Sequence, residues 1–216
     1  LGTTGSDGNA GGVIASAKAA FNNNTTVISN CGNYADQTWG GSAKQFFVGG
    51  VIGFCQNRNS KSAKSELENL KNIANLTFTA KGSDSTLAGG ICGAIGGDRA
   101  NCLNEGVFYG TIKAIGMAEL VGIVYGNSRT DSRYVKKVQC GGNVVFNTED
   151  VTVEDANGDI ETIKKDIIVP ITIENLPLYI YAHGDTTAAQ LATDNCTVIT
   201  EKPAVPANPY SQDTNN

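Results

Sequence analysis

Charged and aromatic residues are scarce in this chain of 216 residues: 17% are Asp, Glu, Lys or Arg, and 7% are aromatic. The chain instead holds 22 Asn and 26 Gly, which favour turns over helices. This composition excludes a helical bundle. The formal net charge of -5 also removes the electrostatic basis for phosphate contacts, so we expect no nucleic-acid partner.

Histidine occurs once, as His183, and the sequence has no long apolar run. A single imidazole excludes a zinc site built from several histidines, and any Ser-His-Asp or Cys-His mechanism would depend on this residue. It follows a short apolar run and precedes Gly184, which is typical of a loop after a strand. No stretch approaches the roughly 20 apolar residues of a membrane helix, so we expect no membrane insertion of this domain.

A glycine-rich element recurs along the chain. Its first glycines lie 38, 40 and 33 residues apart, and its copies are Ala10–Ala15, Val48–Gly53, Ala88–Gly93 and, more loosely, Val121–Gly126. Self-similarity of this kind is the signature of a repeat architecture.

A second element follows the first in each unit, as a short apolar run introduced by Asn and ended by Gly. Its copies are Ile28–Asn33, Leu67–Ala74, Arg99–Val107 and Val135–Val144, with a weaker copy at Asp194–Ile199. Two short strands per unit predict an all-β, right-handed parallel β-solenoid, or β-helix. We expect Val13, Val51 and Ile91 to point inward and Gly or Asn to take the corners with positive φ.

The repeats also set the expected organisation of the chain. We expect a flexible lead over residues 1–8 and solenoid repeats over 9–147. A hairpin insertion and C-terminal cap of the same domain should cover 148–201, followed by a Pro-rich tail over 202–216.

One segment of the second unit fits a strand less well. Residues 62–76 place apolar side chains at 63, 67, 70 and 74, the spacing of an amphipathic helix. The same segment has Leu67, Leu70, Ile73 and Leu76 at intervals of three, as in a leucine-rich repeat. We expect a short helix or irregular coil that enters a strand over 76–80, and a leucine-rich repeat domain is the alternative.

Beyond residue 144 the pattern changes to alternating β-branched runs around Asn157-Gly158. An Asn-Gly pair between such runs is a strong hairpin signal, because both residues tolerate positive φ. We predict a β-hairpin that projects from the last coil. Pro170 restricts the following strand to an edge or bend, and residues 187–192 suggest one helical turn.

The paired Gly-Gly-Val-Ile-Gly and Asn-Cys-x-Asn-x-Gly elements resemble the GLUG-type repeats of bacterial cell-surface proteins. The run Ile173–Tyr181 resembles the closing segment that often follows such repeats in secreted proteins of gut anaerobes. The resemblance covers roughly residues 9 to 200. It implies an adhesin-like protein located outside the cell or on the outer surface of a bacterium.

Six cysteines stand at positions 31, 55, 92, 102, 140 and 196, an even number that would permit disulfides in an exported chain. In the repeat alignment Cys31 and Cys102 share a column with Leu70 and Val138, and Cys55 and Cys92 lie in or beside first-strand positions. We therefore predict buried free thiols, with at least one disulfide as the alternative. The chain has no CxxC pair, so we expect no metal site.

Carboxylates offer two candidate sites. Asp155, Asn157 and Asp159 are spaced like the first ligands of an EF-hand, but Ile160 stands where that loop requires Gly, so we predict a turn. Parallel β-helices often host polysaccharide-cleaving enzymes that use paired carboxylates, and residues 98–99 and 129–133 are the candidate loops here. Neither places two carboxylates on one strand, so we expect no catalytic residue, no cofactor and no enzyme.

Exposed aromatic side chains can stack on sugar rings, and Tyr34 and Trp39 lie in a glycine-flanked segment. They are therefore weak candidates for ligand binding. The alternative is that Trp39, the only tryptophan, packs against the side of the solenoid.

The sequence thus favours a non-enzymatic extracellular β-solenoid module of a bacterial surface protein, with a role in adhesion or surface display. Its partner would be a host or glycan ligand at the cell surface. The alternative function is a glycan-binding or polysaccharide-cleaving β-helix protein.

Overall fold

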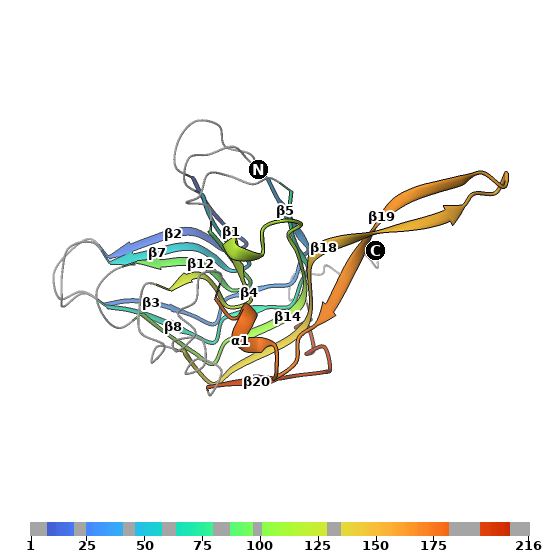
Figure 1. Cartoon of the computed structure of the whole chain (residues 1–216). Helices are drawn as coiled ribbons and strands as arrows, with labels where there is room; N and C mark the ends of the chain where they lie inside the picture. The colour runs from blue at the N-terminus through green and yellow to red at the C-terminus, as the bar shows by residue number, and fades with distance from the viewer. Residues whose placement is uncertain are drawn as a thin grey trace, which may run out of the picture.

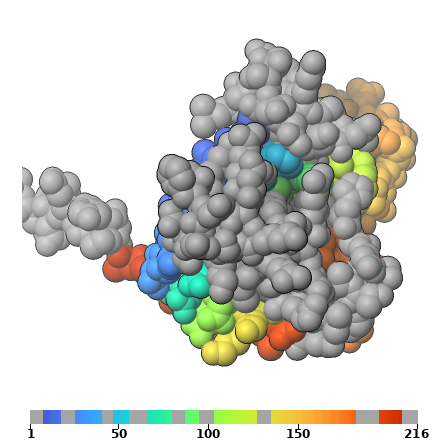
Figure 2. All heavy atoms as spheres, turned by 90° about the vertical axis from the view of Figure 1, so that its left-hand side faces the viewer, coloured from blue at the N-terminus to red at the C-terminus, as the bar shows by residue number. Residues whose placement is uncertain are grey.

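The chain folds into a stack of parallel β-coils in the computed structural model, which describes residues 8–19, 25–40, 46–57, 64–79, 87–96, 101–128, 135–181 and 195–207. Figure 1 shows the coils side by side, with the later part of the chain extending away from the stack. In the side view of Figure 2, colours from blue through green and yellow to orange follow one another along the lower rim, which is the order of the coils in the chain. Among the described residues no helix has the length and apolar character needed to cross a membrane.

Each coil passes through four faces of the solenoid. Coil one contains β1 (Gly8–Gly11), β2 (Ile14–Ala19), β3 (Thr25–Ser29), β4 (Gly32–Asn33) and β5 (Gln37–Trp39). Coil two contains β6 (Phe46–Gly49), β7 (Ile52–Asn57), β8 (Lys64–Glu68), β9 (Lys71–Asn72) and β10 (Leu76–Phe78). Coil three contains β11 (Leu87–Gly89), β12 (Cys92–Gly96), β13 (Asn101–Asn104) and β14 (Val107–Lys113). Coil four contains the 3-10 turn η1 (Ala118–Leu120), β15 (Val121–Gly122), β16 (Tyr125–Ser128), β17 (Val135–Lys136) and the start of β18 (Val138–Glu154).

Equivalent strands of successive coils pair in parallel and in register. On the first face Ala10, Val48, Ala88 and Val121 lie opposite one another, so the glycine-rich repeats of the sequence stack directly. The predicted parallel β-solenoid is therefore confirmed, with pairing of equivalent strands on all four faces. This pairing provides partners in the neighbouring coils for backbone N–H and C=O groups of the strands.

The core consists of inward side chains stacked in columns, as expected for a repeat whose apolar face is covered only by its neighbours. Val51 and Ile91 are fully buried, as predicted. Val13, in the same column, is 48% exposed, so its predicted burial is wrong. It belongs to coil one, which has a neighbouring coil on only one side among the described residues.

The repeat glycines stand at points of close backbone approach. A Cβ at Gly49 would lie 1.9 Å from the carbonyl oxygen of Ile52, and one at Gly89 would lie 2.0 Å from that of Cys92. The positive-φ corners are instead at Asn30, Asn69, Glu105 and Lys137. The predicted Asn corners are therefore confirmed at Asn30 and Asn69, and Gly116 takes positive φ between coils three and four. The repeat glycines Gly49 and Gly89 do not take positive φ and are required by space instead.

Residues 64–78 form strands in the structure, so the expected helix or irregular coil is wrong. The segment supplies β8, β9 and β10, which pair in parallel with strands of coils one and three. Leu67 and Leu70 are both buried although they lie three residues apart, because the left-handed corner at Asn69 turns the chain between them. The leucine-rich repeat alternative is overturned by the same pairing, whereas the predicted strand from Leu76 is confirmed over Leu76–Phe78.

Polar ladders connect the coils at the fourth face. The buried Asn33 Nδ2 donates to Asn72 Oδ1 at 2.7 Å, and Asn72 Nδ2 donates to the carbonyl oxygen of Gly90 at 2.9 Å. At the exposed side of the same face Asp36 accepts hydrogen bonds from both the backbone N–H and the side chain of Asn75. These bonds hold three coils in one register because each donor faces an acceptor in the next coil.

The predicted hairpin follows the last coil. β18 continues past the solenoid and returns as β19 (Ile160–Pro170), with Gly158 in the turn at φ +86°. Pro170 ends β19, where a missing N–H costs no ladder bond. The helix α1 (Leu176–Tyr179) and the strand β20 (Cys196–Val198) then cover coil four: Tyr181 bridges to Tyr125, and β20 pairs with β18. His183 and the helical turn expected over 187–192 lie outside the described residues.

Candidate functional site

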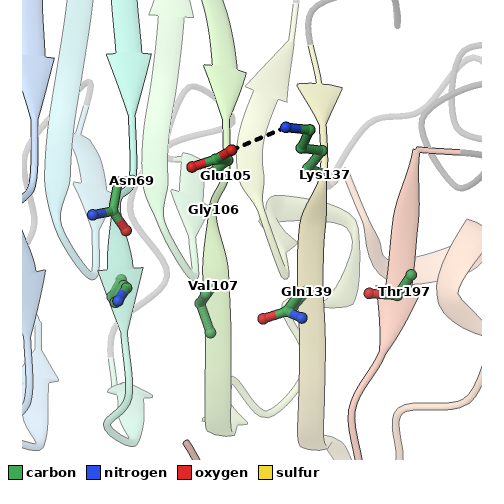
Figure 3. Close-up of a pocket in the computed structure, with 8 residues that line it drawn as sticks. Asn69, Glu105, Gly106, Val107, Lys137, Gln139 and Thr197 are labelled. Carbon is green, nitrogen blue, oxygen red and sulfur yellow. Dashed lines mark hydrogen bonds and ion pairs between the residues drawn. The ribbon is translucent and has the colours of Figure 1, made fainter.

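A polar groove of about 500 Å³ crosses the outer corner between the third and fourth faces (Figure 3). Its walls are supplied by equivalent positions of coils two, three and four and by β20. It is lined by Asn69, Lys71, Glu105, Gly106, Val107, Lys137, Gln139 and Thr197.

The solenoid register places these side chains next to one another although they are far apart in sequence. Asn69, Glu105 and Lys137 occupy the positive-φ corner in successive coils. Two residues further along, Val107 pairs with both Lys71 and Gln139, and Gln139 pairs with Thr197. Figure 3 shows these positions as successive columns across adjacent strands.

Gly106 lines the groove and lies against the core of coil three. A Cβ there would lie 2.7 Å from Leu103 Cδ2 and 3.2 Å from Ile91 Cδ1, so the core leaves no room for a side chain. The backbone at Gly106 therefore lies directly on the core of its own coil, and the polar side chains on either side remain at the surface.

The electrostatics of the groove are dominated by a bridged pair and two amides. Lys137 Nζ lies 3.0 Å from Glu105 Oε1, with both side chains largely exposed to water. Beside them Asn69 Nδ2 donates to Asn30 Oδ1 at 2.8 Å, while Gln139 is exposed. The groove thus offers both donors and acceptors of hydrogen bonds, and such groups bind hydroxyl-rich ligands.

Acid-base catalysis has little support in this groove. Its lining holds one carboxylate, Glu105, and that carboxylate is paired with Lys137. Hydrolysis of a glycosidic bond normally needs two carboxyl groups a few ångströms apart. In the part of the chain that the structure describes, no three His, Cys, Asp or Glu residues come together as a metal site would require.

A second hollow of about 470 Å³ lies on the fourth face near the base of the hairpin. Lys113 at its rim forms an ion pair of 2.5 Å with Asp166 of β19. It is lined by Thr77, Phe78, Thr79, Lys113, Ile115, Gly116 and Met117. Its lining holds no carboxylate.

The two aromatic candidates occupy different environments. Trp39 is 8% exposed: it lies opposite Phe78 of the next coil in the strand register, and its indole N–H donates to Gln37 Oε1 at 3.2 Å. Its burial favours the packing interpretation over a sugar-stacking role. Tyr34 is 36% exposed and lies over Gly32, where a Cβ would contact its ring. Neither residue lines the polar groove.

The acidic turn of the hairpin binds its own backbone. Asp155 Oδ1 accepts hydrogen bonds from the N–H groups of Asn157 at 2.8 Å and Asp159 at 2.9 Å. These bonds, that from Asp159 first, lower the pKa of the Asp155 carboxyl below its ordinary value. The geometry supports the predicted turn in place of a calcium loop. The candidate loops at 98–99 and 129–133 lie outside the described residues.

The described cysteines include free and deeply buried thiols. Cys31, Cys92, Cys140 and Cys196 are free, and Cys55 is also buried. A hydrogen bond with Cys196 is the main cause that raises the pKa of the Cys140 thiol, and burial raises it further. Burial also raises the pKa of the Cys92 thiol. The predicted buried free thiols are confirmed for Cys92, Cys140 and Cys196, whereas Cys31 is free but only half-buried. The Cys92 and Cys140 thiols are poor nucleophiles because their thiolate form is disfavoured.

The predicted cysteine column needs one correction. Cys31 directly precedes Gly32, which pairs with Lys71, so Cys31 and Leu70 do share a column. Cys102 pairs with Glu66, four positions before that column, and Gly106 takes the place assigned to it. An Asn-Cys pair stands at the corner of coil one, as Asn30-Cys31, but before the corner of coil three, as Asn101-Cys102. Aligning the repeats on this pair therefore placed the third unit in the wrong register.

This misalignment also explains why the groove was not predicted. Asn69, Glu105 and Lys137 share no residue type, and their equivalence is evident only once the third unit is shifted. The sequence did contain one signal: Lys71, Val107 and Gln139 each stand two residues after the corner residue of their coil.

Comparisons with protein-family models, with curated proteins and with solved structures find no match to this chain. The class of protein that the fold and site define is a parallel β-solenoid with a polar groove at one corner. Its relation to GLUG-type repeats stays a prediction from the motifs.

Proposed function

We propose that this chain is a non-enzymatic extracellular β-solenoid module of a bacterial surface protein, used for adhesion or surface display. The observation that carries the proposal is the polar groove across coils two to four and β20, whose one carboxylate is paired with Lys137. A stack of this kind presents the same outer position from every coil, which suits a binding surface more than a catalytic centre.

The resemblance of the repeats to GLUG-type elements supports the location at the cell surface. The scarcity of charge and the Asn-rich, Gly-rich coils fit a rigid module that presents a face to a ligand. The free thiols of Cys92, Cys140 and Cys196 neither favour nor oppose an extracellular location, because they are buried in the core.

Glycan binding is a second candidate function, and the lining of the groove favours it. The lining includes amide, hydroxyl, ammonium and carboxylate groups, which can form hydrogen bonds with the hydroxyl groups of a sugar. Tyr34 offers a partly exposed ring outside it. Polysaccharide cleavage is the less favoured form of this alternative, because the groove lacks a second carboxylate.

Affinity electrophoresis tests the proposal. The purified chain is run through gels that contain host or plant polysaccharides, and each lane is assayed for reducing sugar. Retardation without new reducing ends supports a glycan-binding adhesin, and no retardation in any gel shifts the proposal to display or to a protein ligand. New reducing ends from the wild-type chain would contradict the non-enzymatic proposal.

A further inference from the structure

The hairpin formed by β18 and β19 projects from the solenoid with little support (Figure 1). Within the described residues β19 pairs with β18 alone, so its other edge carries unpaired backbone groups. A two-stranded hairpin is marginally stable in water, and a free β-branched edge is a template for another strand. This hairpin also leaves Ile160 75% exposed and Ile168 62% exposed.

Cross-strand pairing shows which residues share each face of the hairpin. Because side chains alternate along a strand, Glu161, Ile163 and Lys165 of β19 share one face. Val153, Val151 and Glu149 lie opposite them on β18. The middle of this face is therefore apolar, and charged residues lie on either side of it.

This face is self-complementary. If two copies of β19 pair antiparallel about Ile163, each Glu161 lies opposite the Lys165 of the other copy. Ile163 then lies opposite itself, with Val151 on the outer strand at either side. The central row becomes Val-Ile-Ile-Val, and the rows above and below it pair opposite charges, which are the cross-strand combinations that stabilise sheets.

The other charges of β19 already have partners within the chain. Lys164 Nζ lies 2.6 Å from Asp150 Oδ1, and Asp166 is bound by Lys113. For Glu161 the opposite residue on β18 is the apolar Val153. A second copy would supply the lysine that this position lacks.

We propose that the β19 edge binds a second copy of this chain, forming a four-stranded antiparallel sheet about a two-fold axis at Ile163. Such an interface is isologous, so the same contacts are made twice and the assembly closes as a dimer. The inference stands apart from the proposed function, because it concerns the hairpin and not the groove.

Charge reversal tests the dimer directly. Glu161→Lys places two lysines opposite each other in both rows, and Lys165→Glu places two glutamates there. Each variant alone should weaken self-association by about tenfold or more, as measured by sedimentation equilibrium. An equimolar mixture of the two should regain the wild-type affinity as a one-to-one heterodimer, which native mass spectrometry identifies by its intermediate mass.

Two controls separate the effect of the interface charges from a general effect of charge or of misfolding. Lys136→Glu makes the same charge change on β17 of the solenoid and should leave the dimer intact. Circular dichroism of each variant verifies folding, and recovery in the mixture excludes misfolding as the cause of loss. A wild-type chain that stays monomeric contradicts the proposal, including one that instead binds phosphatidylcholine vesicles through its exposed isoleucines. A dimer whose affinity is unchanged by both charge reversals also contradicts the proposal.

Discussion

At the scale of single residues, the repeat glycines and the corner residues have different roles. The sequence pattern predicted where the chain bends, but it assigned the glycines to positive φ. In the structure Gly49 and Gly89 are selected by contact with carbonyl oxygens of their own coil. Sequence alone could not separate these causes, because both lead to glycine.

A pair of glycine substitutions tests this distinction. Gly49→Ala should prevent folding or destabilise the protein severely, because its Cβ would lie within 2.7 Å of Gly93 N as well as 1.9 Å from Ile52 O. Gly116 has φ +70° with no atom within 4 Å of a Cβ, so Gly116→Ala should cost only about 1–2 kcal/mol of backbone strain. Urea unfolding of the two variants measures the difference, and equal losses would refute a steric role for Gly49.

The Asp36 carboxylate should make stability depend on pH. Hydrogen bonds from Asn75, that of its backbone N–H first, lower the pKa of Asp36 in the folded chain. Its contribution is therefore fully present above the unfolded pKa of about 3.9 and is lost as pH falls through the lower folded pKa.

Asp36→Asn provides the measurement. Wild type should be more stable than this variant at neutral pH, and the difference should shrink in acid until it vanishes below the folded pKa of Asp36. Chemical denaturation across this pH range gives the two curves. A difference that is constant with pH would show that the carboxylate charge has no part in this ladder.

Thiol reactivity should follow burial. In a Cys102→Ser background, Cys31 is half-buried and should react with a thiol reagent such as DTNB in the folded state. Cys92 and Cys140 should react only after unfolding, since their raised pKa values and burial disfavour the thiolate. Adding Cys31→Ser should abolish the early reaction, and an early reaction that survives it would contradict this assignment.

At the scale of elements, the strands of the glycine-rich repeat and the strand from Leu76 were predictable, whereas the strands over residues 64–72 were not. The step from Leu67 to Leu70 fits a helix only because the left-handed corner at Asn69 rotates the chain between them, so that both side chains point inward. Periodicity rules assume a straight element, so a corner within the window defeats them. The hairpin was predictable because Asn157-Gly158 determines its turn locally.

Coupling between coils tests the strand assignment of residues 64–68. Leu67 lies opposite Leu103 on the neighbouring coil, and both side chains are buried. Each change to Ala should cost about 2–5 kcal/mol in the free energy of unfolding. A double-mutant cycle should give a coupling of about 0.5–3 kcal/mol for this pair.

The matched control for that cycle pairs Leu67 with Leu176 of α1. Leu176 is equally buried but belongs to the cap beyond coil four, so the two losses should add. Additive losses for Leu67 and Leu103 would mean that β8 and β13 do not lie in the register described.

At the scale of the whole molecule, the sequence predicted the stack of coils but not the groove on its surface. A repeat pattern in the sequence identifies the inward positions, because similar apolar residues recur there. Exposed or half-buried positions such as Lys71 and Gln139 differ in residue type from coil to coil, and only the register places them in one column. The aromatic candidate Trp39 could not be excluded from the sequence, because its burial depends on the register that places it opposite Phe78.

The central claim is that the groove is a non-catalytic binding surface, and side-by-side affinity electrophoresis tests it most directly. Wild type, Gln139→Ala and Lys136→Ala are compared in the polysaccharide gel that retards wild type most, with a reducing-sugar assay of each lane. Gln139 lines the groove, whereas Lys136 is exposed on β17 outside its lining. We predict equal retardation of wild type and Lys136→Ala, weaker retardation of Gln139→Ala, and no new reducing ends. Equal retardation of all three, or new reducing ends in the wild-type lane, would contradict the claim.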